Sequence, residues 1–175
     1  LKSSLVQDTS KVSVQLYAES LCPDCIGYMS EITELMQTIP EIVNLEIFPY
    51  GNAKESGPDT NGQYTFTCQH GNNECIANMY EACAISHYPE VVNNIPTWFG
   101  FYQCMENSKA SPSLNTVVTK CASNNGLDFS VISACSGSNP ALGSETDGNP
   151  LMHSIAQLTA ALNPAHTYVP WVVIN

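Results

Sequence analysis

The feature that most constrains this chain is a pair of cysteines, Cys22 and Cys25, set between the pattern of a strand and the pattern of a helix. Apolar residues alternate over residues 12–18, which predicts a half-buried strand. After the cysteines, apolar residues recur every three or four positions as far as Pro40, which predicts a helix with one buried face. Pro23 suits the first turn of that helix, where an N–H group lacks a helical partner in any case. The two cysteines are therefore expected where a strand leads into a helix.

This position favours redox chemistry at Cys22. The first turn of a helix has unpaired N–H groups and the positive end of the helix dipole, and both stabilise a thiolate. The thiolate is the form of cysteine that attacks disulfides. Two other interpretations stay open, namely half of a zinc site and a purely structural disulfide. A second cysteine pair with the same two-residue gap is missing, which disfavours zinc.

Composition restricts the compartment and the partners. The net charge is -11, with five lysines, sixteen acidic residues and no arginine, so nucleic acid and anionic membranes are unsuitable partners. No stretch of the sequence is long and apolar enough to predict membrane insertion. Eight cysteines in a chain that begins without methionine favour a mature protein from an oxidising compartment, with a signal peptide already removed. Residues 1–10 show no period and are expected to form a loose tail.

The order of the remaining patterns predicts the fold. Residues 43–48 alternate again, which predicts a second strand joined to the first by a right-handed parallel crossover. Pro170 leads into an apolar run at 171–174, which predicts a third strand. We therefore expect an α/β, thioredoxin-like fold in which Pro170 is a cis-proline that lies against the cysteine pair. We expect a single domain over residues 1–175, with its core at about 11–50 and 164–175 and a helical insertion at about 68–163.

Short helical patterns fill the expected insertion. One begins near Asn73, one runs from Ser111-Pro112 to near Gly126, and one begins at Asn149-Pro150. In the last of these, the residues expected to face inward are Leu151, Ile155, Leu158 and Leu162. The other six cysteines lie in this region and are expected to cross-link it: Cys68, Cys75, Cys83, Cys104, Cys121 and Cys135. They allow fifteen pairings, and the sequence does not choose among them. Core packing is the favoured role for Trp98 and Phe101, and also for Met29 and Met36 on the first helix.

The segment CQHGNNECIAN at 68–78, followed by Cys83, closely resembles the signature of the gamma-interferon-inducible lysosomal thiol reductases. Further motifs support the resemblance: PYGNA at 49–53, LMH at 151–153 and YVPW at 168–171. The resemblance spans roughly residues 12–175. It implies a thioredoxin fold with a helical insertion, and reduction of protein disulfides at acid pH in endosomes or lysosomes.

The resemblance also implies roles for individual residues. By position, Cys22 is the nucleophile, Cys25 resolves the mixed disulfide, and Pro170 completes the catalytic site. Pro23, Asp24 and Val169, the residue before Pro170, are expected to contact the substrate. No cofactor or metal is expected, because an external small thiol would act as reductant. The expected partners are disulfide-containing proteins, in a lysosomal, endosomal or extracellular compartment.

Activity in acid requires the Cys22 thiolate to form well below the ordinary pKa of a thiol. Lowering a thiol pKa from about 8.5 to about 5 requires about 4.8 kcal/mol, whereas a helix terminus supplies about 0.3 to 2 kcal/mol. Asp24 would oppose the thiolate while ionised. N–H groups facing the sulfur or a histidine must supply the remainder, unless only a small thiolate fraction forms. His166 is one candidate, whereas His70 is better interpreted as bracing the insertion.

Two alternative functions remain open. The same scaffold supports a disulfide oxidase or isomerase, because motif and fold do not decide the direction of the exchange. A secreted, non-catalytic binding protein that contacts a partner through an acidic face is the other alternative.

Overall fold

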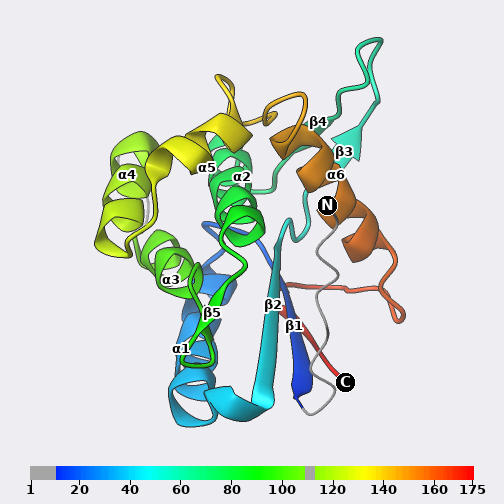
Figure 1. Cartoon of the computed structure of the whole chain (residues 1–175). Coiled ribbons are helices and arrows are strands. Elements are labelled where there is room, and N and C mark those ends of the chain that lie inside the picture. Colours follow the sequence, from blue (N-terminus) through cyan, green and yellow to red (C-terminus); the bar gives the residue numbers. More distant parts are fainter. Residues whose placement is uncertain (1–10, 109–112) are drawn as a thin grey trace.

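The computed structural model describes residues 11–108 and 113–175 (Figure 1). The tail expected at 1–10 lies outside these described residues, and so does the start of the helix expected at Ser111-Pro112.

A three-stranded sheet lies at the centre of the fold. Its strands are β1 (Val12–Ala18), β2 (Val43–Pro49) and β7 (Trp171–Ile174), in the order β2-β1-β7. β1 and β2 run parallel, with Val12 opposite Val43 and Ala18 opposite Pro49, and β7 runs antiparallel to β1. The helix α1 (Pro23–Thr38) and the short 3-10 helix η1 (Pro40–Ile42) form the connection from β1 to β2. The predicted parallel pair and the predicted third strand are both confirmed.

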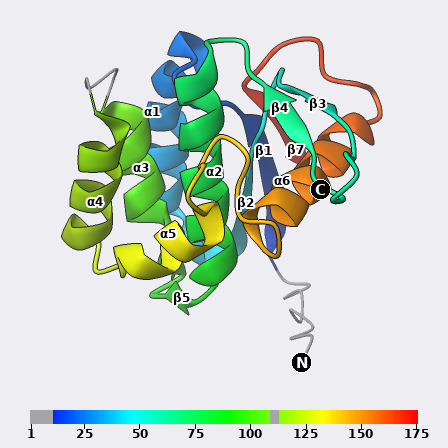
Figure 2. The same cartoon turned by 90° about the horizontal axis from the view of Figure 1, so that it is seen from above.

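The segment between β2 and β7 is mainly helical, as expected. Its elements are β3 (Lys54–Ser56), β4 (Thr65–Thr67), α2 (Asn72–His87), β5 (Val91–Val92), β6 (Ile95–Pro96), α3 (Phe99–Asn107), α4 (Leu114–Asn124), α5 (Phe129–Ser136) and α6 (Gly148–Ala160). Figures 1 and 2 show α1, α2 and α3 on one side of the strands and α6 on the other. In the described part of the chain, no helix combines the length and the apolar character needed to cross a membrane. The division into a core at 11–50 and 164–175 and an insertion at 68–163 stays a prediction.

Three disulfides cross-link the helical segment. Cys68–Cys75 joins the end of β4 to α2, Cys83–Cys135 joins α2 to α5, and Cys104–Cys121 joins α3 to α4. Cross-linking shrinks the conformational freedom of the unfolded chain, by about 2 to 4 kcal/mol for each bridge. Because all six of these cysteines pair among themselves, Cys22 and Cys25 remain as free thiols.

Two apolar clusters form the core. One lies among the helices and includes Met79, Phe101 and Ile132. The other joins the sheet to α1, and its buried members include Met29 and Met36 of α1 and Trp98 of the helical segment. Core packing of these methionines and aromatic residues is therefore confirmed.

The prediction for the buried face of α6 was partly wrong. Leu158 is 48% exposed, whereas the residues buried on this helix include Met152, Ala156 and Thr159. The helix begins at Gly148, ahead of the expected Asn149-Pro150 start, and the buried Asn149 anchors that end. Thr159 can face inward because its hydroxyl donates a hydrogen bond to the Ile155 carbonyl at 2.9 Å.

Candidate active site

The two free cysteines lie where the sequence predicts, at the start of α1. The backbone leaves β1 at Ala18 and turns at Leu21, which has a φ of 64°, an uncommon conformation for a residue with a side chain. Cys22 is then the N-cap residue, and Pro23 is the first residue of the helix. The carbonyl of Cys22 accepts the hydrogen bond of the Ile26 N–H at 3.0 Å. Cys22 therefore belongs to the first turn, beside N–H groups that have no helical partner.

The residues of the motif differ in their exposure to solvent. The side chains of Cys22 and Cys25 are 6% and 3% exposed, whereas Pro23 and Asp24 between them are exposed. The two buried thiols are thus separated in sequence by two residues that are open to solvent.

The loop before β7 reaches the same place. The Val169–Pro170 peptide bond is cis, as expected. Val169 is buried in the same apolar cluster as Cys22 and Cys25. Trp171 pairs with Tyr17 near the end of β1, so the sheet register brings Pro170 to the edge from which the cysteines emerge. The structure therefore brings together the motif and the Val169–Pro170 loop.

The Cys25 thiol is held in its neutral form. Burial raises the pKa of Cys25 above its ordinary value, and the Glu19 backbone only partly opposes this rise. The nearby Cys22 raises the pKa of Cys25 further. Cys25 is therefore protonated at neutral and at acid pH.

A buried polar stripe on α2 holds the residues that precede the motif. Glu74, Asn78 and Glu81 lie four and three positions apart, on one face of the helix, and all are fully buried. The Ser20 N–H donates to Asn78 Oδ1 at 2.8 Å, and the Ser20 hydroxyl donates to Glu81 Oε2 at 2.8 Å. The stripe therefore fixes the chain two residues before Cys22.

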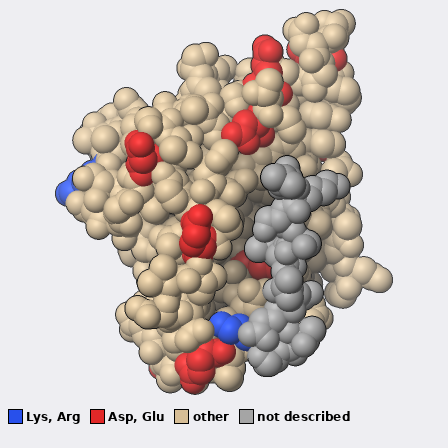
Figure 3. Space-filling view, viewed as in Figure 1, with Lys and Arg blue, Asp and Glu red and all other residues tan. Residues whose placement is uncertain are grey.

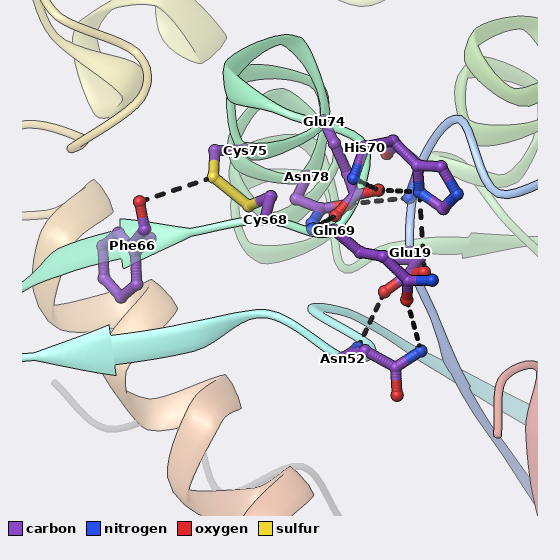
Figure 4. Close-up of a disulfide and its surroundings, with 10 residues drawn as sticks. Glu19, Asn52, Phe66, Cys68, Gln69, His70, Glu74, Cys75 and Asn78 are labelled. Atoms are coloured by element: carbon purple, nitrogen blue, oxygen red, sulfur yellow. Dashed lines mark hydrogen bonds and ion pairs between the residues drawn. A yellow bond between two sulfur atoms is a disulfide. The ribbon is translucent and has the colours of Figure 1, made fainter. Parts of the chain in front are cut away.

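The carboxylate of Glu19 is the point where two of the sequence motifs meet (Figure 4). The Asn52 N–H, from the PYGNA motif, donates to Glu19 Oε2 at 2.7 Å. On the other side, His70 Nδ1 lies 3.7 Å from Glu19 Oε1 and forms a short ion pair with Glu74. Gly51 has a φ of 57°, and a Cβ there would lie 2.4 Å from Glu19 Oε2. The motifs thus converge on the segment that carries the cysteines.

The histidines fit structural roles. His70 contacts Glu74 and Glu19 beside the Cys68–Cys75 disulfide, which supports the bracing interpretation. His166 forms no hydrogen bond or ion pair within the described ranges. The expectation that it assists the thiolate gains no support from these contacts.

Within the described part of the chain, two groups of side chains have the donor atoms for a metal. Glu19, His70 and Glu74 form one of them, but the imidazole already serves as the partner of the Glu74 carboxylate. His87, Cys135 and Asp147 form the other, in which the Cys135 sulfur is committed to a disulfide. Neither group includes Cys22 or Cys25.

Sequence reasoning missed the acidic residues around the motif. It assigned α2 one apolar face, with Cys75, Met79 and Cys83, and these residues are indeed buried. A second face, with Glu74 and Glu81, is buried as well. The signal that could have found this second face is the helical spacing of the polar residues Glu74, Asn78 and Glu81, which recur after four and three positions and so share one face.

A sheet of this order, a Cys-X-X-Cys pair at the N-terminus of its first helix and a cis-proline before the neighbouring strand define a thioredoxin-like protein. Solved structures agree on the fold. A putative protein disulfide isomerase from Nitrosomonas europaea superposes with a TM-score of 0.61 at 14% identity, over 94% of this chain and 85% of that chain. A thioredoxin-like oxidoreductase from Silicibacter pomeroyi gives a TM-score of 0.57 at 17% identity, over 94% of this chain and 74% of that chain.

The chain belongs to the gamma interferon inducible lysosomal thiol reductase (GILT) family, whose family description matches residues 13–125. The Gamma-interferon-inducible lysosomal thiol reductase of Carassius auratus is 36% identical over 100% of this chain and 64% of its own length. The protein of the same name from Mus musculus is 36% identical over 94% of this chain and 60% of its own length. The chain thus spans less than two thirds of the length of these relatives.

Proposed function

We propose that this chain reduces protein disulfides by dithiol exchange through Cys22 and Cys25. The observation that carries the proposal is the state of the eight cysteines. Six are paired in the helical segment, and the two that remain free lie side by side at the start of α1, beside the Val169–Pro170 loop. Membership of a family of thiol reductases supports the same activity.

The exchange has two steps. The Cys22 thiolate attacks one sulfur of the substrate disulfide, so a Cys22–substrate bond forms, the substrate S–S bond breaks and the leaving thiolate takes a proton from solvent. Cys25 then loses its proton to solvent and attacks the Cys22 sulfur, which releases the second substrate thiolate and leaves a Cys22–Cys25 disulfide. Two electrons pass from the pair to the substrate. An external small thiol returns the pair to the dithiol.

The different environments of the two cysteines support these roles. Cys22 is at the N-cap, where helix N–H groups favour a thiolate, whereas burial keeps Cys25 protonated until it is needed. Exposed Pro23 and Asp24 would contact the substrate around the reacting sulfur. The side chain of Val169 is buried, so we assign its contact with the substrate to the main chain, next to Pro170.

We place the activity in an acidic endosomal or lysosomal compartment, or outside the cell. The relatives carry "lysosomal" in their names, and three disulfides suit an oxidising route of synthesis. The proposed partners are disulfide-containing proteins and a small-thiol reductant.

A reduction assay over pH 4 to 8, with insulin as the disulfide substrate, tests the proposal. The wild type should reduce insulin in the presence of a small thiol, and Cys22→Ser and Cys25→Ser should each lose most of that rate. The double variant, checked for the same circular dichroism as the wild type, gives the background rate. If both single variants reduced insulin at the wild-type rate, the assignment would be wrong.

Thiol labelling of the wild type and the cysteine variants distinguishes a reductase from a non-catalytic binding protein. A non-catalytic scaffold predicts that the Cys22–Cys25 pair resists both thiol labelling and reduction. Acidic residues form separate groups, not one continuous patch, on the face shown in Figure 3, so that face offers no single acidic surface to a partner.

A further inference from the structure

Two buried carboxyl groups behind the motif lack the partners that buried charges need. Glu81 on α2 and Glu106 on α3 are 1% and 2% exposed. Among the described residues, three of their four carboxyl oxygens accept no hydrogen bond, and the fourth accepts the bond from the Ser20 hydroxyl. The hydroxyl of Tyr102, also buried on α3, is unpartnered too. Unsatisfied buried groups in such number require an explanation.

No cation among the described residues neutralises these groups. Neither carboxyl forms an ion pair within residues 11–108 and 113–175. The titratable groups that interact with them from the surrounding elements are Cys25 on α1, Tyr102 on α3 and Glu74 on α2, and none of these can carry a positive charge. Two ionised carboxylates in such a place would be very costly.

A shared proton accounts for the geometry. The helices α2 and α3 pack against each other, and the buried carboxyl groups of Glu81 and Glu106 each shift the pKa of the other. A proton on one therefore serves as the donor that the other lacks, and Ser20 orients the pair through Glu81. The pair is neutral when it holds two protons and carries one negative charge when it holds one.

The pair lies next to the resolving cysteine. Cys25 and Tyr102 pack in the same apolar cluster, and Glu106 follows Tyr102 by one helical turn. The charge of Glu106 acts on Cys25, and the charge of Cys25 acts on Tyr102. Ser20, the anchor of Glu81, is two residues from Cys22.

We propose that Glu81 and Glu106 are positioning residues for the dithiol exchange, which set the charge beside Cys25 according to pH. In acid the pair holds both protons, and Cys25 lies beside a neutral group. As the pH rises the pair loses one proton, and its negative charge then opposes formation of the Cys25 thiolate. This inference rests on the proposed function, because it assigns a pH limit to the second step of that exchange.

The direction of the carboxyl pKa values supports this assignment. Burial raises the pKa of Glu106 to about 7. Burial and the charge of Glu106 raise the pKa of Glu81 well above its ordinary value. The pair is therefore neutral in an acidic compartment and becomes anionic near neutrality. In the second step the Cys25 sulfur displaces the substrate from Cys22. In acid the Cys25 thiolate needed for this step forms more easily beside the neutral pair than it would beside a carboxylate that stayed charged.

A titration of Cys25 tests the proposal without any reductase assay. The Cys22→Ser variant leaves Cys25 as the one free thiol, because the other six cysteines are paired. Its ionisation is followed by the rate of alkylation with iodoacetamide from about pH 5 to about pH 10, because that rate is proportional to the thiolate fraction even well below a raised pKa. Adding Glu106→Gln should lower the apparent pKa of Cys25 by about one unit, so that alkylation at pH 8.5 is about tenfold faster. At pH 5 the two proteins should agree within about twofold. Superimposed curves over the whole range would overturn the proposal.

Control variants distinguish the effect of the removed charge from the effect of any disturbance of the fold. Glu34→Gln removes an exposed carboxylate from α1, the helix that carries Cys25, and should leave the titration of Cys25 unchanged. Glu81→Gln keeps an oxygen for the Ser20 hydroxyl and should shift Cys25 in the same direction as Glu106→Gln.

A measurement on the wild type keeps the proposal testable if both glutamine variants fail to fold. NMR of 13C-labelled glutamate carboxyls should show at least one group that titrates near pH 7. If every glutamate titrates below pH 5.5, the shared proton does not exist and the proposal is wrong. Failure of the insulin assay alone would leave these titrations unaffected, so the two proposals fail separately.

Discussion

The buried carboxyl of Glu106 predicts that the protein loses stability as the pH rises from acid to neutral. Its pKa is raised by burial from 4.5 to about 7 in the folded chain. Between these two values the folded state keeps a proton that the unfolded state has lost, so the unfolded state binds fewer protons and stability falls with pH. The contribution is fully present below about pH 4.5 and is lost as the pH rises through about 7. At about 1.36 kcal/mol per unit, the loss amounts to about 3 kcal/mol.

The Glu106→Gln variant isolates this effect. Urea unfolding under non-reducing conditions at pH 5 and pH 8 gives the free energy of unfolding of each protein at each pH. Between the two pH values, the free energy of unfolding of the wild type should fall by about 3 kcal/mol more than that of Glu106→Gln. This difference includes any change that the substitution causes in the titration of Glu81. Glu34→Gln, on the exposed face of α1, should behave as the wild type. Equal losses in wild type and Glu106→Gln, or a smaller loss in the wild type, would refute the reasoning.

Three further outcomes follow from the structure. Removal of the Cys83–Cys135 bridge, which spans 52 residues, by substitution of both cysteines with alanine should lower the free energy of unfolding by about 4 kcal/mol; a loss below about 1 kcal/mol in urea unfolding would contradict this. Gly51→Ala should destabilise by about 1 to 3 kcal/mol in thermal melts, because its Cβ would meet Glu19, and Gly62→Ala, with a positive φ but open space, should cost less. Equilibration with glutathione should show that the Cys22–Cys25 pair is more reducing than glutathione, where each tenfold change in the equilibrium constant corresponds to about 30 mV. A pair that is clearly more oxidising than glutathione would instead support the oxidase or isomerase.

The sequence carried most of the information for the sheet and for the placement of the motif. β1 was predicted at its observed bounds because alternation over seven residues is typical of an extended chain. The expectation that it is half-buried was wrong, because Ser13 and Tyr17 on its second face are buried as well. The start of α1 was equally clear, because Pro23 fits only the first turn of a helix. The cis form of Pro170 was expected from the thioredoxin-like order of the elements, because no local pattern around Pro170 specifies it.

What the sequence could not supply depends on contacts between distant segments. Leu158 was placed inward because it is apolar, yet the rotation of α6 is set by where Asn149 docks, and that site is provided by Tyr64 and Leu142. The cysteine pairing depends on how α2, α3, α4 and α5 pack, which no local pattern encodes. Glu81 and Glu106 look like ordinary surface acids until the fold buries them together.

The most direct test of the reductase mechanism is a covalent trap. Cys25→Ser and Cys22→Ser are each incubated with a disulfide-bonded protein, and the products are analysed by non-reducing gels and mass spectrometry. If Cys22 attacks and Cys25 releases, Cys25→Ser accumulates an adduct joined through Cys22, and Cys22→Ser accumulates none. An adduct in equal amounts from both variants, or from Cys22→Ser alone, would contradict the roles assigned to the two cysteines.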